Sequence, residues 1–228
     1  MKTFHSLVLA AALAIPTFGF GGEIVVNGQG SVEQVPDMAT ITLGSQFAAK
    51  QAGDALDQVS EATAAVLETL TEMGLEPRDI QTSGLYLNPV YDDSYTRHGA
   101  RNIRGYSAGN TVHILVRDLD KLGVLLNEVV ENGANTFNGL SFGLQDATDA
   151  KNEARRRAVA DARAKAELYA EAAGVSLGKI VELKDGSTSA PQPVFMKAAA
   201  MEMADSVPIA EGEVSTSARV TITFEIAE

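Results

Sequence analysis

Apolar and polar positions alternate with a helical period most clearly between residues 146 and 174. Small or apolar residues recur there at spacings of three or four, which places them on one side of a helix. The stripe consists of Ala150, Ala154, Ala158, Ala162, Ala166, Tyr169 and Ala173. Because alanine favours helix and adds almost no bulk, we expect another backbone, in particular a sheet, to approach this helix closely. Gly174 is expected to end it as a left-handed cap.

The remaining pattern predicts two more helices and a series of strands. Helical periodicity covers residues 51–73 and 119–131. Two-residue alternation, the signature of a half-buried strand, marks 38–47, 105–116, 140–144 and 218–226, and we interpret 23–30, 85–91 and 180–183 as further strands. We expect the first two strands to pair antiparallel. The order β-β-α-β-β-α-β-α-β-β predicts an α+β fold, in which a mostly antiparallel sheet or sheets pack against three helices.

Two polar or irregular segments interrupt this order. Residues 92–104 are expected to form an exposed hairpin loop, and Pro89 to lie at a sheet edge or a bulge. Residues 187–212 are rich in Pro, Ala, Ser and Met and are interpreted as a long excursion without a packed element. Excursions of this length within a domain usually serve function or assembly.

The N-terminus indicates the compartment. Residues 1–21 resemble a secretory signal peptide, with Lys2 followed by a short apolar core at 7–15. An uncleaved membrane anchor is the alternative, although the core is shorter than the ~20 residues that a span needs. No later segment is long and apolar enough to span, so no transmembrane segment is expected in the mature chain, residues 22–228.

Charge and cysteine content exclude several classes of partner and of functional site. The net charge of -12 argues against a nucleic-acid partner, because phosphates would be repelled. The chain has no cysteine, which excludes disulfides, thiolate metal sites and thiol nucleophiles. We expect a protein of the Gram-negative periplasm, with outer-membrane association as a further expectation.

Few residues suggest chemistry. Asp92, Asp93 and His98 could hold a divalent cation, but their spacing matches no metal motif and a solvated loop is the simpler interpretation. Ser94, His98 and Asp92 could make a nucleophile triad, but all three lie on one loop, whereas the members of a triad are normally positioned by the fold. His113 is interpreted as a half-buried histidine of a strand rather than a catalytic base.

Three other motifs have structural explanations. The Gly28-x-Gly30 pair is followed by Glu33 and by no helix, so it is expected to allow a bulge or a close backbone contact rather than to bind a dinucleotide. The basic run 155–157 spreads around a helix and is expected to form local ion pairs. The methionines of the excursion suit an interface, with a redox or copper role as the alternative.

The same residues carry a family resemblance over nearly all of the mature chain. The motif pieces include Val26-x-Gly28-x-Gly30, Pro36-Asp37-x-Ala39, Asp79-Ile80-Gln81-Thr82, Tyr106-x-Ala108-x-Asn110, Val116-Arg117-Asp118-Leu119-Asp120 and Lys165-Ala166-x-x-Tyr169-Ala170. Taken in order they resemble the SIMPL domain, formerly a domain of unknown function. The resemblance implies a periplasmic or surface-associated α+β protein that forms homo-oligomers, is linked to envelope or oxidative stress and is in some cases an antigen. It implies no catalytic residue and no cofactor.

The sequence therefore predicts a non-enzymatic envelope protein that acts through homo-oligomeric assembly. The candidate contacts lie in the excursion and are Val194, Phe195, Met196, Met201 and Met203. The alternative is a periplasmic module that binds a small ligand or a metal.

Overall fold

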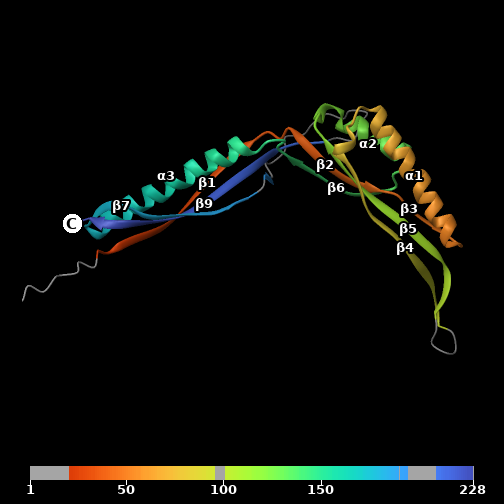
Figure 1. Cartoon of the computed structure of the whole chain (residues 1–228), viewed down its shortest axis with the longest axis horizontal. Helices are drawn as coiled ribbons and strands as arrows, with labels where there is room; N and C mark the ends of the chain where they lie inside the picture. The colour runs from red at the N-terminus through yellow and green to blue at the C-terminus, as the bar shows by residue number, and fades with distance from the viewer. Residues whose placement is uncertain (1–20, 96–100, 190, 195–208, 228) are drawn as a thin grey trace, which may run out of the picture.

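The computed structural model of the chain describes residues 21–95, 101–189, 191–194 and 209–227. These residues form two antiparallel sheets, each with helices on one face, in two arms that meet at an angle (Figure 1). The predicted α+β class and order of elements are confirmed, with two short strands added at Gln46–Ala49 and Gln192–Val194. None of the helices in this part of the chain has both the length and the apolarity needed to cross a bilayer.

The first arm is built on a sheet that we call sheet A. It consists of β1 (Glu23–Gln34), β7 (Ser176–Thr188), β8 (Gln192–Val194) and β9 (Glu213–Ala227), with α3 (Thr148–Ala173) along one face. β9 is central, with β1 along one edge and β7 followed by β8 along the other. The expectation that the first two strands pair with each other is wrong, because β1 pairs along its whole length with the last strand, β9.

The second arm is built on sheet B. It consists of β2 (Met38–Gly44), β3 (Gln46–Ala49), β4 (Ile80–Tyr95), β5 (Arg101–Val116) and β6 (Thr136–Gly143), covered by α1 (Ala52–Glu72) and α2 (Leu122–Glu131). Short 3₁₀ turns, Pro77–Asp79 and Leu119–Lys121, precede β4 and α2. β5 pairs with β4 on one side and with β2 and β3 on the other, and β6 adds to the outer side of β2. β4 and β5 pair as the expected hairpin, but the prediction of a loop over residues 92–104 is wrong at both ends, because β4 continues to Tyr95 and β5 begins at Arg101. Pro89 lies on β4, an edge strand, as expected.

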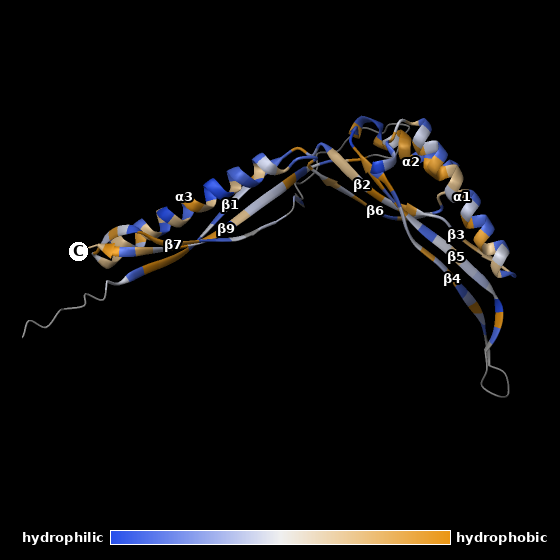
Figure 2. Ribbon diagram, in the orientation of Figure 1, coloured by the Kyte–Doolittle hydropathy of each residue, from blue (hydrophilic) through white to orange (hydrophobic). Residues whose placement is uncertain are grey.

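Each sheet has its own core. In sheet B the inward residues of β2 and β5 pack against leucines and valines of α1 and α2, and Ile41, Leu70 and Leu125 are fully buried. In sheet A the alanine stripe packs against Val26 and Ile222 among other residues. Figure 2 shows the outward surface of α3 as largely hydrophilic, in keeping with a helix that buries only one narrow side.

The contact between α3 and β1 is nearly backbone to backbone. A side chain at Gly28 would collide with the carbonyl oxygen of Ala158, and one at Gly30 with that of Ala154. The two glycines and the alanine stripe therefore remove the side-chain layer that normally separates a helix from a sheet. The predicted close approach, and the structural explanation of the two glycines, are both confirmed.

The buried alanines of α3 recur every four residues from Ala150 to Ala170. Ala170 is buried, whereas Tyr169 is 54% exposed and Ala173 is exposed, so the prediction that the last two belong to the stripe is wrong. Four residues turn a helix through about 400°, so a stripe of this spacing advances ~40° around the helix at each step. A twisted sheet can follow such a winding stripe. Gly174 ends the helix in the left-handed conformation, with φ 69°, as predicted.

Side chains of α3 also close the outer edge of β1. Arg157 Nη1 donates to the carbonyl of Ser31 at 2.7 Å, and Lys165 Nζ donates to that of Asn27 at 3.1 Å. Between them the Gln29 N–H donates to Asp161 Oδ2 at 2.8 Å. Residues four apart on α3 thus meet residues two apart on β1. The two spacings agree because four residues of a helix rise about 6 Å and two residues of a strand about 6.7 Å. An open strand edge, which can recruit other strands, is thus covered along this stretch.

Candidate functional site

Polar side chains gather where the two arms meet. The chain passes from sheet A to sheet B through residues 35–37 and returns through residues 144–147. Gln145 joins the two connections, since its N–H donates to Asp37 Oδ1 at 2.6 Å and its Nε2 donates to the Asp37 carbonyl at 2.9 Å. The Asp37 N–H in turn donates to the carbonyl of Gly143 at 3.1 Å.

An ion pair of sheet B anchors this junction. Arg117 Nε and Nη2 donate to the two carboxylate oxygens of Asp79 at 3.0 and 2.7 Å, and Arg117 Nη1 donates to Gln145 Oε1 at 3.2 Å. The Asp79 side chain is only 7% exposed. The hydrogen bonds from Arg117 hold the pKa of this carboxyl below its ordinary value, and the positive charges of Arg117 and Arg78 act in the same direction against the cost of burial.

The network of Asp37, Asp79, Arg117 and Gln145 fits a structural role, in which it fixes the connection between the two arms. A bidentate arginine–carboxylate pair has fixed geometry, and here it sets where the strand end at Arg117 meets the connection at Gln145. Sequence reasoning missed this network. The only available signal was that the motif pieces at Pro36-Asp37, Asp79 and Arg117 each lie at the end of a strand, and no spacing along the chain shows that they converge.

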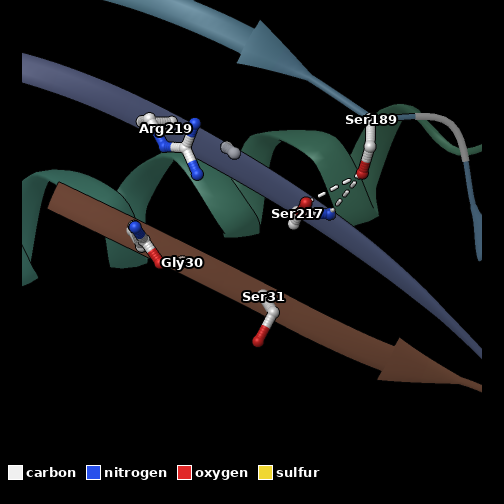
Figure 3. A pocket seen from close by; sticks show the side chains of 7 residues that line it. Gly30, Ser31, Ser189, Ser217 and Arg219 are labelled. Carbon is white, nitrogen blue, oxygen red and sulfur yellow. Dashed lines mark hydrogen bonds between the residues drawn. The ribbon is translucent and has the colours of Figure 1, made fainter. Parts of the chain in front are cut away.

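A small polar pocket opens on the face of sheet A away from α3. It measures about 230 Å³ and is lined by Gln29, Gly30, Ser31, Ser189, Ser217, Ala218 and Arg219. Figure 3 shows Ser189 and Ser217 joined by hydrogen bonds near Arg219, with Gly30 and Ser31 on the neighbouring strand. The two hydroxyl oxygens are 2.8 Å apart, and the Ser217 N–H also donates to Ser189 Oγ at 3.3 Å. Hydroxyls and a guanidinium around one hollow are groups that can bind an oxyanion.

His113 lies on β5, as predicted for a strand histidine. Its Nδ1 is 3.1 Å from Thr42 Oγ1 on β2, and the side chain is half-buried. Among the residues that the structure describes, no group of three or more histidine and carboxylate side chains could hold a metal ion.

The basic run forms the predicted local ion pairs. Arg156 and Arg157 both contact Glu153, at 2.9 and 3.1 Å, whereas Arg155 points to Asp185 of β7 at 3.5 Å. Two of the guanidinium groups thus share one carboxylate and the third points to β7, so each of the three charges is paired with a carboxylate.

The remaining candidates are only partly within the described residues. Asp92 is exposed on β4, and Asp93 and Ser94 belong to the same strand, while His98 lies outside the described residues. Val194 ends β8, where it pairs with Glu213 of β9, so part of the expected excursion belongs to sheet A. Phe195, Met196, Met201 and Met203 lie outside the described residues.

Comparison with known proteins finds one matching family model and several related bacterial proteins. The family model described as "SIMPL: Protein of unknown function (DUF541)" matches residues 24–224. The chain is 36% identical to the "26 kDa periplasmic immunogenic protein" of Brucella melitensis, over 98% of this chain and 95% of the relative. It is 30% identical to the "Uncharacterized protein YggE" of Escherichia coli K12, over 88% of this chain and 79% of the relative. The protein of the same name from Edwardsiella ictaluri is 31% identical, over 89% and 84%.

We predict that Arg117→Gln destabilises the protein at neutral pH, because it leaves the Asp79 carboxylate buried without its partner. The folded-state pKa of Asp79 is lowered, so its stabilising effect is complete above its unfolded pKa of about 3.9 and is lost as pH falls through the folded value. The difference between the two proteins should therefore be largest near pH 7 and shrink below about pH 4. Urea unfolding at pH 7, 4 and 3 measures it.

Arg163→Gln is the matched control, since Arg163 pairs with an exposed carboxylate, Glu167, at 3.0 Å and its own side chain is 67% exposed. It should change the urea midpoint much less. Equal effects of the two substitutions, or a difference that does not depend on pH, would show that the junction pair does not carry this stability.

Proposed function

This chain belongs to the SIMPL family, and on that premise we propose that it is a non-catalytic protein of the Gram-negative periplasm that works by associating with further copies of itself. The periplasmic location is supported by the printed name of the Brucella melitensis relative, which matches almost the whole chain. A role in envelope or oxidative stress stays a prediction from the family resemblance. The self-association rests on the surface of sheet B.

Apolar side chains on the hairpin of β4 and β5 carry the proposal. Leu85 and Leu87 of β4 are 65% and 42% exposed, and Ile103 of β5 is 52% exposed. Tyr91 and Val90 next to them are 46% and 39% exposed. Scattered apolar residues are ordinary on a surface, but a run along an edge strand favours contact with another chain. The edge of β1 is closed by α3, whereas β4 and β6, at the outer edges of sheet B, each pair on one side only within the described residues, and we place strands or side chains of a second copy there.

In the proposed contact, residues of the excursion at 187–212 bind the exposed apolar surface of sheet B on another copy. Val194, Phe195, Met196, Met201 and Met203 combine an aromatic ring with flexible thioethers, which adapt to irregular apolar surfaces. In this proposal they anchor one copy to the next, and the exposed apolar residues of sheet B receive them.

We predict that the mature chain, residues 22–228, is a multimer at micromolar concentration by size-exclusion chromatography with light scattering. Replacing Phe195, Met196, Met201 and Met203 together by serine should shift it towards monomer, because the apolar area available for association is lost. The matched control replaces alanines 198, 199, 200 and 204 of the same segment by serine, which removes little apolar area, and should leave the mass unchanged. A wild-type monomer, or a multimer indifferent to the four substitutions, contradicts the proposed contact.

The polar pocket of sheet A supports a second candidate function, binding of a small oxyanion. The observation in its favour is the grouping of the Arg219 guanidinium with the hydroxyls of Ser31, Ser189 and Ser217 around one hollow. Guanidinium and hydroxyl donors suit a carboxylate or a phosphate, whereas an apolar ligand would leave them unpaired.

We predict that titration with inorganic phosphate shifts the backbone amide resonances of residues 29–31 and 217–219, and that Arg219→Met removes these shifts. Arg163→Met is the control, because Arg163 pairs with Glu167 on the exposed side of α3 and should not affect binding. Shifts that persist in Arg219→Met, or none in the wild-type protein at millimolar phosphate, exclude this candidate.

A further inference from the structure

An apolar hollow lies between α2 and the first residues of β6. Leu126, Asn127, Val130, Glu131 and Phe137 line it, and it measures about 380 Å³. Leu126 at its floor is 7% exposed, while Val130 and Phe137 at its sides are 59% and 55% exposed. A large aromatic ring is thus half in water beside a hollow with space for a further side chain.

The hollow adjoins an open strand edge. β6 bonds to β2 along one side, and within the described part of the chain no strand pairs with its other side. An extended segment laid along this edge would obtain backbone hydrogen bonds from β6 and place alternate side chains towards α2. Strand addition of this kind combines affinity from the backbone with specificity from side-chain pockets.

We propose that the α2–β6 hollow receives Phe195 and Met196 of a second copy of the chain. The inference rests on the proposed self-association and names the surface that accepts the anchor. A phenyl ring and a thioether both pack favourably against an aromatic ring such as Phe137. Lys197 follows directly, and Glu131 of α2, which lines the hollow, offers it a carboxylate.

The position of β8 favours a second copy over the same chain. Val194 pairs with Glu213, beside the pairing of Gln34 with Val214, where β1 leaves sheet A for the junction. At the junction Asp37 bonds to Gly143, the far end of β6 from the hollow. Gly143 is six residue steps along the strand from Phe137, a distance of about 20 Å. Phe195 directly follows Val194, and one residue extends the chain by only ~3.5 Å, which favours the hollow of a second copy over that of the same chain.

Disulfide trapping tests the assignment cleanly, because the chain has no cysteine of its own. Asn127→Cys places a thiol at the rim of the hollow, and Lys197→Cys places one beside the proposed anchor, and both leave Phe195, Met196, Val130 and Phe137 in place. The two single variants, one of them labelled with ¹⁵N, are mixed and mildly oxidised, and cross-linked peptides are identified by mass spectrometry. Each variant has one thiol, so every cross-link joins two copies.

The expected result is a 127–197 cross-link at least about tenfold more abundant than the 60–197 cross-link formed with Ser60→Cys, since contact raises the local thiol concentration. Ser60 is exposed on α1 and serves as the matched control. If light scattering shows a multimer but the 127–197 cross-link is not in excess, the hollow is not the acceptor, and the proposed self-association still stands. A monomer would overturn both.

A separate measurement detects the case in which the hollow binds Phe195 and Met196 of its own chain. The double variant Asn127→Cys/Lys197→Cys would then form an intrachain disulfide at dilutions where the mixed single variants form no cross-link. That outcome overturns the assignment to a second copy. As a further measurement, Phe137→Asp should weaken self-association about tenfold or more by placing a charge in the contact, while Val124→Asp, an equally exposed position on α2, should not.

Discussion

The structure of this protein depends on a contact in which almost no side chain intervenes. Alanines 154, 158 and 162 of α3 lie on the backbone of β1 at Gly28 and Gly30, where any side chain would strike a helix carbonyl. Close packing at protein density tolerates little added volume. The position of the long helix relative to sheet A is therefore set by atoms of the backbone, which cannot adapt in the way that large flexible side chains do.

Two consequences follow from that approach. The helix is near enough for Arg157, Asp161 and Lys165 to satisfy polar groups on the edge of β1, so one edge of the molecule is closed to other strands. The hydrogen bonds from Lys165 and from the Gln29 backbone also lower the pKa of Asp161, which keeps this carboxylate ionised in the folded protein. The edge of β6 and the exposed apolar side chains of the β4–β5 hairpin, on which the proposed self-association rests, lie on sheet B, beyond the junction of Asp79, Arg117 and Gln145. Stability and self-association are thus assigned to different arms.

Local patterns in the sequence predicted the helices, most strand positions and the close approach to α3, because periodicity and small residues report directly on local geometry. They failed for contacts between distant segments. The first two strands were expected to pair because they are neighbours in the sequence, but β1 pairs with β9 at the other end of the chain. The junction network joins Asp37, Asp79, Arg117 and Gln145, which no spacing relates. The apolar hollow escaped notice because Val130 and Phe137 look like ordinary core residues until the fold leaves them exposed.

The thermal unfolding of Ala158→Leu, set against Ala164→Leu, tests the helix contact most directly. Ala158 is fully buried against β1, whereas Ala164 is exposed on the same helix, so the two substitutions match in chemistry and in helix propensity. The account predicts that Ala158→Leu loses at least about 3 kcal/mol, because the added atoms meet backbone that cannot move aside. This corresponds to a fall in Tm of roughly 6 °C or more, with little change for Ala164→Leu. Equal melting temperatures for the two variants would contradict the flush contact of α3 with β1.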